Sequence, residues 1–144
     1  MALITTVAKG EFGHLYPISV TYQVGKKHYI LVEDESGNYM VMPINDDGAF
    51  GASISTKTFS RYYDIMQAAY DDQTATTYLC AVSLSGKYME VFATNSTGLV
   101  SKNAWNFEID DRKTFNFFFI KGLLFIYQGD EDANGKYTVK SIAY

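Results

Sequence analysis

Five residues in the middle of the chain carry side chains suited to reversible ligand binding: Asp46, Asp47, Asn95, Asn103 and Trp105. Their carboxylate and amide groups can hydrogen-bond ligand hydroxyls, and an indole ring offers a flat face on which C–H groups can stack. Sugar recognition needs both kinds of group. The two aspartates and Asn95 lie in turn-like segments and could equally only shape those turns, while Trp105 could equally pack in the core.

An acidic segment near the end of the chain matches the opening of a calcium-binding loop. Asp130, Asp132 and Asn134 occupy ligand positions 1, 3 and 5, and Gly135 occupies position 6. Position 12 is Ser141 rather than glutamate, and strand-like runs flank the segment instead of helices. The match therefore gives a weak candidate for Ca²⁺ binding, with a solvated acidic turn as the alternative.

Motifs of catalysis are missing from the sequence. We find no serine nucleophile elbow, no phosphate-binding glycine loop and no His-Glu-x-x-His motif. His14 and His28 lack the spacing of metal ligands. We therefore expect a protein that is not an enzyme and that needs no cofactor, apart from the weak calcium candidate.

Composition favours one packed β domain covering residues 1–144. Aromatic residues make up 16% of the chain, with 12 Tyr and 10 Phe, and a chain of this length can bury a sizeable core. The net charge of -4 argues against nucleic acid or an anionic membrane as partner. Cys80 is the only cysteine, no signal peptide is recognisable, and no apolar run reaches the length of a membrane span. We expect a soluble protein, cytoplasmic or exported without a leader.

A repeat of 49 residues organises the chain. Gly37, Gly86 and Gly135 are each followed two residues later by tyrosine. Apolar strands are predicted before and after these glycines, a third strand follows, and an aromatic-x-Ile strand precedes each unit. The ranges are 29–32, 78–82 and 124–127 before the glycines; 39–42 and 88–92 after them; 49–54 and 99–101 for the third strands; and 16–18, 63–65 and 107–109 for the aromatic-x-Ile strands. A period of this length indicates supersecondary units that share a core.

The third unit stops at residues 141–144, before its remaining strands. Residues 3–9 and 12–18 are predicted to supply them, so that the termini meet and a ring closes. The third unit should also be the least regular. Within the second unit, residues 60–72 place several apolar side chains on one helical face, so a helix is the alternative there.

Three such units resemble the β-trefoil superfamily. Trefoil repeats commonly show a glycine turn with Tyr-Leu-x-Val, then Asp/Asn-Gly, then an aromatic-x-Phe-x-Leu/Ile strand, and the second unit is similar at residues 86–91, 95–98 and 105–109. Asn103-Ala104-Trp105 is similar to the Gln-x-Trp element of ricin-type lectins. Arg61 and His14 stand where the other units would need tryptophan. The resemblance implies a monomeric lectin fold with unequal sites.

Propeller lectins are the second resemblance, carried by residues 86–105, which are similar to one blade. Propellers typically need four to eight blades, so three units would have to dimerise into a six-bladed ring. Another β sandwich or barrel is a further alternative. We expect a carbohydrate-binding, lectin-like module with glycans as partners. The alternative is a protein-interaction or structural trefoil, similar to fascin, growth factors or protease inhibitors, with a protein partner.

Overall fold

The computed structural model describes residues 2–109, 114–129 and 134–142, which form eleven β-strands and no helix. The strands are β1 (Ile18–Val24), β2 (Lys27–Glu33), β3 (Asn38–Ile44), β4 (Ser55–Thr58), β5 (Ile65–Asp71), β6 (Thr76–Ser83), β7 (Tyr88–Thr94), β8 (Val100–Glu108), β9 (Thr114–Ile120), β10 (Leu123–Gly129) and β11 (Tyr137–Ile142). The all-β prediction is confirmed. Nowhere in these ranges is there a helix long and apolar enough to cross a membrane.

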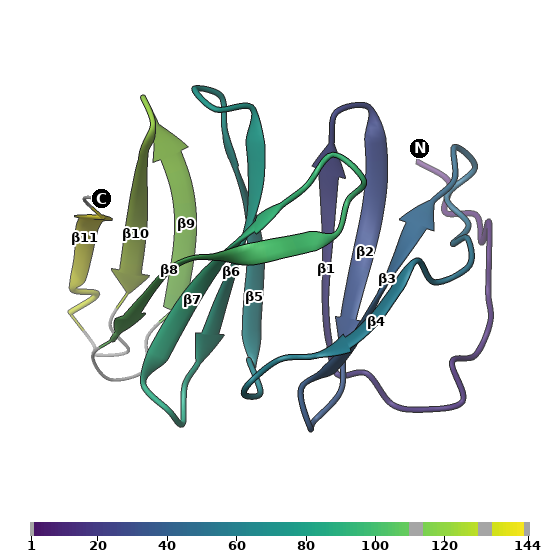
Figure 1. The fold of residues 1–144 in the computed structure, drawn as a ribbon, viewed down its shortest axis with the longest axis horizontal. Coiled ribbons are helices and arrows are strands. Elements are labelled where there is room, and N and C mark those ends of the chain that lie inside the picture. Colours follow the sequence, from purple (N-terminus) through teal and green to yellow (C-terminus); the bar gives the residue numbers. More distant parts are fainter. Residues whose placement is uncertain (1, 110–113, 130–133, 143–144) are drawn as a thin grey trace.

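Each repeat forms its own antiparallel sheet of consecutive strands (Figure 1). The first sheet has the order β1-β2-β3-β4, the second β5-β6-β7-β8, and the third β9-β10-β11. Gly37 and Gly86 lie in the turns between the second and third strands of their sheets, and Gly135 lies just before β11. Each sequence repeat thus corresponds to one sheet. Trefoil repeats are not confirmed, because every sheet in the described ranges pairs strands of a single repeat.

The three sheets pack face to face, with the second in the middle. Successive side chains of β6 point to opposite faces of the second sheet, as expected for a strand that is buried on both faces. Leu79 and Ala81 join a core with the first sheet, around Leu31. Cys80 and Val82 join a second core, with side chains of the third sheet. Each sheet contributes its first strand to the contacts between sheets: β5 lies next to both β1 and β9. Residues of different repeats are therefore brought together.

Several local predictions need correction. Residues 49–54, expected to be a strand, make only an isolated bridge between Ile44 and Phe50, and β4 begins later, at Ser55. Residues 60–72 contain strand β5, so the helical alternative is wrong. The aromatic-x-Ile pattern opens β1 and β5, but at residues 107–109 it lies at the end of β8 instead. Tertiary pairing decided these cases, since short apolar runs do not specify the strand that they will join.

Residues 2–17 form no strand, although residues 3–9 and 12–18 were expected to form two. They lie beside the first sheet: Val7 lies close to Gly48, and Val7, Phe12, Met42 and Phe50 line a shared hollow. The N-terminal residues and β11 lie at opposite sides of the molecule in Figure 1. Within one chain, residues 2–17 therefore do not complete the third sheet, in which three strands are described where the others have four.

Cys80 should be chemically inert in the native protein. Its side chain is fully buried, and this burial raises the pKa of the thiol above its usual range, so that almost no thiolate forms near neutral pH. We expect no reaction with a thiol reagent such as Ellman's reagent under native conditions, and one equivalent after denaturation in guanidinium. Rapid native labelling would contradict the packing of the second sheet.

Candidate ligand-binding groove

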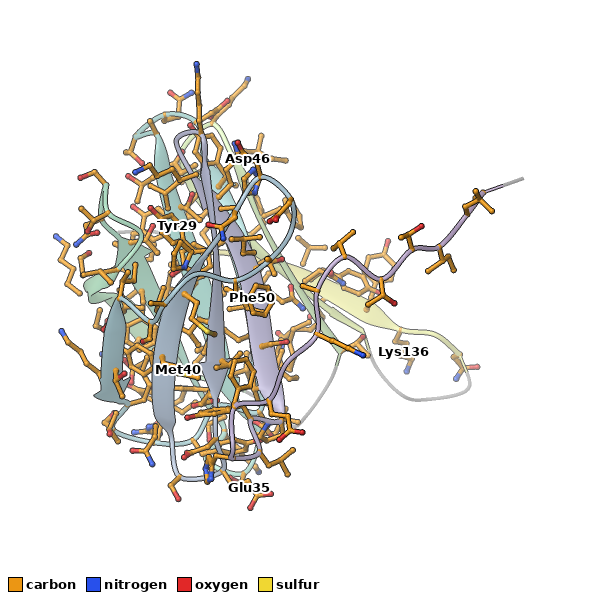
Figure 2. All side chains as sticks on the ribbon, turned by 90° about the vertical axis from the view of Figure 1, so that its right-hand side faces the viewer. Tyr29, Glu35, Met40, Asp46, Phe50 and Lys136 are labelled. Carbon is orange, nitrogen blue, oxygen red and sulfur yellow. The ribbon has the colours of Figure 1, made fainter. Side chains whose placement is uncertain are left out.

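Asp46 and Asp47 lie in the turn that follows β3. The backbone of Asn45 closes this turn, donating its N–H to the Ala49 carbonyl at 2.8 Å and accepting from the Gly48 N–H at 2.8 Å. Asp47 Oδ1 accepts from the Ala49 N–H at 3.0 Å, which is ordinary turn chemistry. Asp46 lies near the tip (Figure 2) and lines a hollow of about 440 Å³ together with Lys26 and Lys27.

Asn95 occupies the matching turn after β7 and shapes it in a similar way. Its Oδ1 accepts from the backbone N–H groups of Thr97 at 3.0 Å and Leu99 at 3.1 Å, and from the Thr97 hydroxyl at 2.7 Å. This side chain is therefore engaged within its own turn. Its influence on a ligand would be indirect, through the position of the turn.

Asn103 and Trp105 lie on opposite faces of the second sheet. Asn103 pairs with Phe92, whose ring belongs to the core shared with the first sheet, and its Nδ2 donates to the buried Glu90 carboxylate. Trp105 belongs to the other core, where its ring lies 5.3 Å from that of Tyr78. The two residues are thus not brought together into one site.

The calcium candidate falls mostly on residues that the structure does not describe. Asp130 and Asp132 lie outside the described ranges, while Asn134 is exposed just before β11. Over residues 2–109, 114–129 and 134–142, no group of three His, Cys, Asp or Glu side chains is arranged to hold a metal ion.

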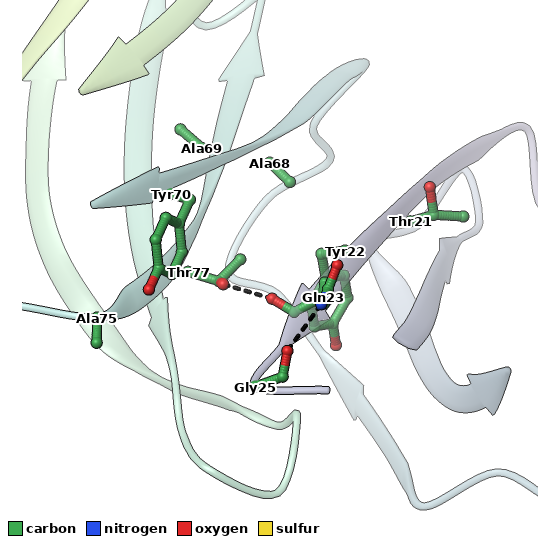
Figure 3. Close-up of a pocket in the computed structure, with 9 residues that line it drawn as sticks. All are labelled: Thr21, Tyr22, Gln23, Gly25, Ala68, Ala69, Tyr70, Ala75 and Thr77. Atoms are coloured by element: carbon green, nitrogen blue, oxygen red, sulfur yellow. Dashed lines mark hydrogen bonds between the residues drawn. The ribbon is translucent and has the colours of Figure 1, made fainter. Parts of the chain in front are cut away.

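A groove of about 550 Å³ opens between the first and second sheets, next to the hairpins β1–β2 and β5–β6 (Figure 3). Tyr70 contributes an aromatic ring, and this residue is 56% exposed. Thr21, Gln23 and Thr77 contribute hydroxyl and amide groups. Among the described residues that line it, none is Asp, Glu, Lys, Arg or His. The groove therefore offers one aromatic face and several neutral hydrogen-bonding groups.

Hydrogen bonds between the sheets set the shape of the groove in advance. The Thr77 hydroxyl donates to the Gln23 carbonyl at 2.5 Å, which links β6 to β1. Within the β1–β2 hairpin, Gln23 Nε2 also donates to the Gly25 carbonyl at 2.8 Å (Figure 3). The Tyr22 hydroxyl donates to the Gly98 carbonyl at 2.5 Å. Burial raises the pKa of Tyr22 above its usual range, so this hydroxyl stays a neutral donor.

The turn capped by Asn95 supports one wall of the groove. Gly98 ends that turn and approaches the Tyr29 ring so closely that a Cβ at Gly98 would lie 2.4 Å from Tyr29 Cζ. Tyr29 in turn stacks on Tyr22, with ring centroids 5.6 Å apart. The Asn95 turn therefore holds the tyrosine pair in place, and this is how one predicted residue contributes to the groove.

The small side chains of one strand leave the groove open. Ala68 is the fourth residue of β5, and the fourth residue of β9 is Phe117. Two residues further along each strand, Tyr70 corresponds to Phe119, whose ring stacks on Tyr78 at 5.1 Å. Aromatic rings thus fill the equivalent part of the third sheet. Alternating polar residues along β1 could have suggested an outward polar face, but no local pattern indicates that β5 lies opposite.

A pair of acidic residues lies at the other end of β2. Glu33 is fully buried, its Oε2 accepts from the Tyr63 N–H at 3.1 Å, and its Oε1 has no hydrogen-bond partner in the part of the chain that the structure describes. Burial raises the pKa of Glu33 to about 7. Asp34 instead caps its turn, accepting from the Ser36 and Asn38 N–H groups at 2.8 and 2.9 Å. The Asn38 side chain is the largest of the influences that lower the pKa of Asp34 to about 2.

Fold and groove together define an all-β protein of three repeated antiparallel sheets with an uncharged groove between two of them. A scan against models of known protein families finds no match. A search of curated proteins finds no significant match either.

Proposed function

We propose that the protein is a non-enzymatic binding module and that the groove between the first two sheets takes a neutral carbohydrate. The observation that carries the proposal is a groove lined by the exposed residue Tyr70 together with the hydroxyl of Thr21 and the amide of Gln23. A sugar presents C–H faces that stack on an aromatic ring and hydroxyls that exchange hydrogen bonds with such groups. A charged ligand would find no countercharge among the described lining residues. Binding is reversible and involves no covalent step.

We also propose that one chain forms half of a ring of six sheets, and that two copies complete the ring as in a propeller. Support comes from the sheets themselves, because each repeat forms a separate meander and consecutive sheets pack face to face. A protein-interaction role, the alternative from the sequence, would use exposed apolar side chains such as Phe118, Ile120 and Leu123 on the third sheet.

A glycan array with fluorescently labelled protein tests the proposed ligand class, and calorimetric titration with the strongest hit tests the groove. We expect Tyr70→Ala to weaken that binding about tenfold, because an aromatic contact contributes roughly 0.5–1.5 kcal/mol and about 1.4 kcal/mol is a factor of ten. Tyr70→Phe should keep most of the affinity if stacking dominates. EDTA should change nothing, since no described residue of the groove carries a carboxylate.

Tyr137→Ala is the matched control, because Tyr137 is 66% exposed but lies on β11, outside the groove. Its affinity should equal that of the unchanged protein. Absence of binding to every glycan on the array would overturn the carbohydrate proposal. Equal losses in the Tyr70 and Tyr137 variants would move the site away from the groove.

A further inference from the structure

The hollow at the tip of the β1–β2 hairpin carries positive charge. Lys26, Lys27 and His28 line it together with Asp46, and its volume is about 440 Å³. All three basic residues are exposed. Over residues 2–109, 114–129 and 134–142, neither lysine forms an ion pair. Two ammonium groups at this tip are therefore available to a negatively charged partner.

The hairpin turn places this hollow next to the groove. Val24 pairs with Lys27, so the turn contains only Gly25 and Lys26. Gly25 has a φ of 60°, which the first central position of a type II′ turn requires. Gly25 also lines the groove (Figure 3), and consecutive Cα atoms are about 3.8 Å apart. Lys26 therefore follows directly after the groove, and its flexible stem can reach a group that leaves the groove on this side.

The other side of the groove ends in negative charge. Tyr70 is followed directly by Asp71 and Asp72, where β5 turns into β6. Asp71 is buried and accepts from the Gln73 N–H at 3.0 Å, whereas Asp72 is exposed. Figure 1 shows the β1–β2 and β5–β6 turns at the same end of the molecule. A negative group on a bound molecule is thus attracted at the first turn and repelled at the second.

We infer that the groove binds a neutral sugar unit of an acidic glycan, and that the next unit carries a sulfate or carboxylate group that lies at Lys26 and Lys27. This assignment rests on the proposed carbohydrate function and adds a ligand class and an orientation to it. The acidic unit leaves the groove past Gly25. Each lysine offers three N–H donors, and the His28 ring offers at least one more. Two charges suit a single anionic group, whereas a polyanion such as nucleic acid needs a larger basic surface.

Asp46 limits how strongly the hollow attracts an anion. Its carboxylate belongs to the same lining as the two lysines, so it opposes a bound anion by repulsion between like charges. This candidate from the sequence thus adjusts the affinity without contributing a contact. Asp46→Asn should strengthen the binding of an acidic glycan about twofold, the size of one exposed charge interaction, and should leave the binding of its neutral form unchanged.

A glycan array that carries neutral, sulfated and carboxylated forms of the same glycans tests the assignment. The unchanged protein should bind the acidic members of each bound set more strongly than the neutral member. Preference for one acidic form alone supports the assignment too and identifies the anionic group. Lys26→Gln with Lys27→Gln should weaken acidic binding about fivefold and leave neutral binding unchanged, because exposed ion pairs contribute modestly. Raising the salt concentration from about 0.05 M to about 0.5 M should reduce the preference.

Lys57→Gln with Lys102→Gln is the matched control, because both lysines are exposed on strands outside the groove and the hollow. It removes the same charge. Equal losses in the two double variants would show that overall charge attracts the glycan and would overturn the assignment. Equal or weaker binding of the acidic members by the unchanged protein would also overturn it, while the proposed function would stand. Absence of binding to every glycan would instead overturn the proposed function, and the assignment with it.

Discussion

Gly98→Ala is expected to lower the free energy of unfolding by about 3 kcal/mol. An added Cβ would lie 2.4–2.6 Å from three atoms of the buried Tyr29 ring, a distance at which something must move. Overpacking of this kind costs roughly 1–3 kcal/mol. The φ of 83° at Gly98 also disfavours any side chain, by about 1 kcal/mol more. Movement of the turn would weaken the hydrogen bond from Tyr22 to the Gly98 carbonyl as well.

Gly25→Ala separates the two causes, because Gly25 has a φ of 60° but open space around its Cβ position. This control should lose only about 1 kcal/mol. Urea denaturation followed by circular dichroism measures both variants, and calorimetric titration shows whether the groove beside Tyr22 changes with the turn. Equal losses at Gly98 and Gly25 would show that the Tyr29 ring moves aside easily, and the packing described for this wall would be wrong.

The repeat is visible in the sequence, but the glycines place its first two units one residue closer together than the structure does. A period of 49 aligns Gly37 with Gly86. The structure instead matches Gly37 with Lys87: their carbonyls accept from the Phe59 and Ile109 N–H groups at 2.9 and 2.8 Å. Both residues have positive φ, 84° for Gly37 and 49° for Lys87. Glycine marks such a position only by preference, so another residue can occupy it and mislead an alignment by glycines.

The groove could not be predicted from the sequence, for a different reason. Asn103 and Trp105 are two residues apart, yet a bulge places them on opposite faces of the second sheet, with Asn103 opposite Phe92 and Trp105 packed in the core with the third sheet. Tyr70 and Gln23, which share the groove, come from different sheets and are far apart in the chain. Periodicity predicts which side chains share a face of one strand. It does not predict which faces of separate sheets meet, and that is what forms the groove.

Glu33→Gln is expected to remove a fall in stability that the unchanged protein shows between about pH 4.5 and pH 7. Burial raises the pKa of Glu33 from 4.5 to about 7, and the neighbouring carboxylates of Asp34 and Asp64 add to the rise. In this window the folded protein keeps a proton that the unfolded chain has lost. The stabilisation is full below pH 4.5 and is lost as the pH rises through 7, a change of at most about 3 kcal/mol.

Glutamine keeps the shape of the side chain without its charge, so the variant should be more stable than the unchanged protein at pH 8 and similar to it at pH 4.5. Glu35→Gln, at an exposed neighbouring position, is the control and should follow the unchanged protein. The lowered pKa of Asp34, about 2, changes the stability only below pH 3.8 and so does not contribute between pH 4.5 and pH 7. Urea denaturation at pH 4.5, 6, 7 and 8 gives the profiles. If the stability of the unchanged protein does not fall between pH 4.5 and pH 7, water reaches the Glu33 carboxylate. The contact between β2 and Tyr63 would then be more open than its geometry indicates.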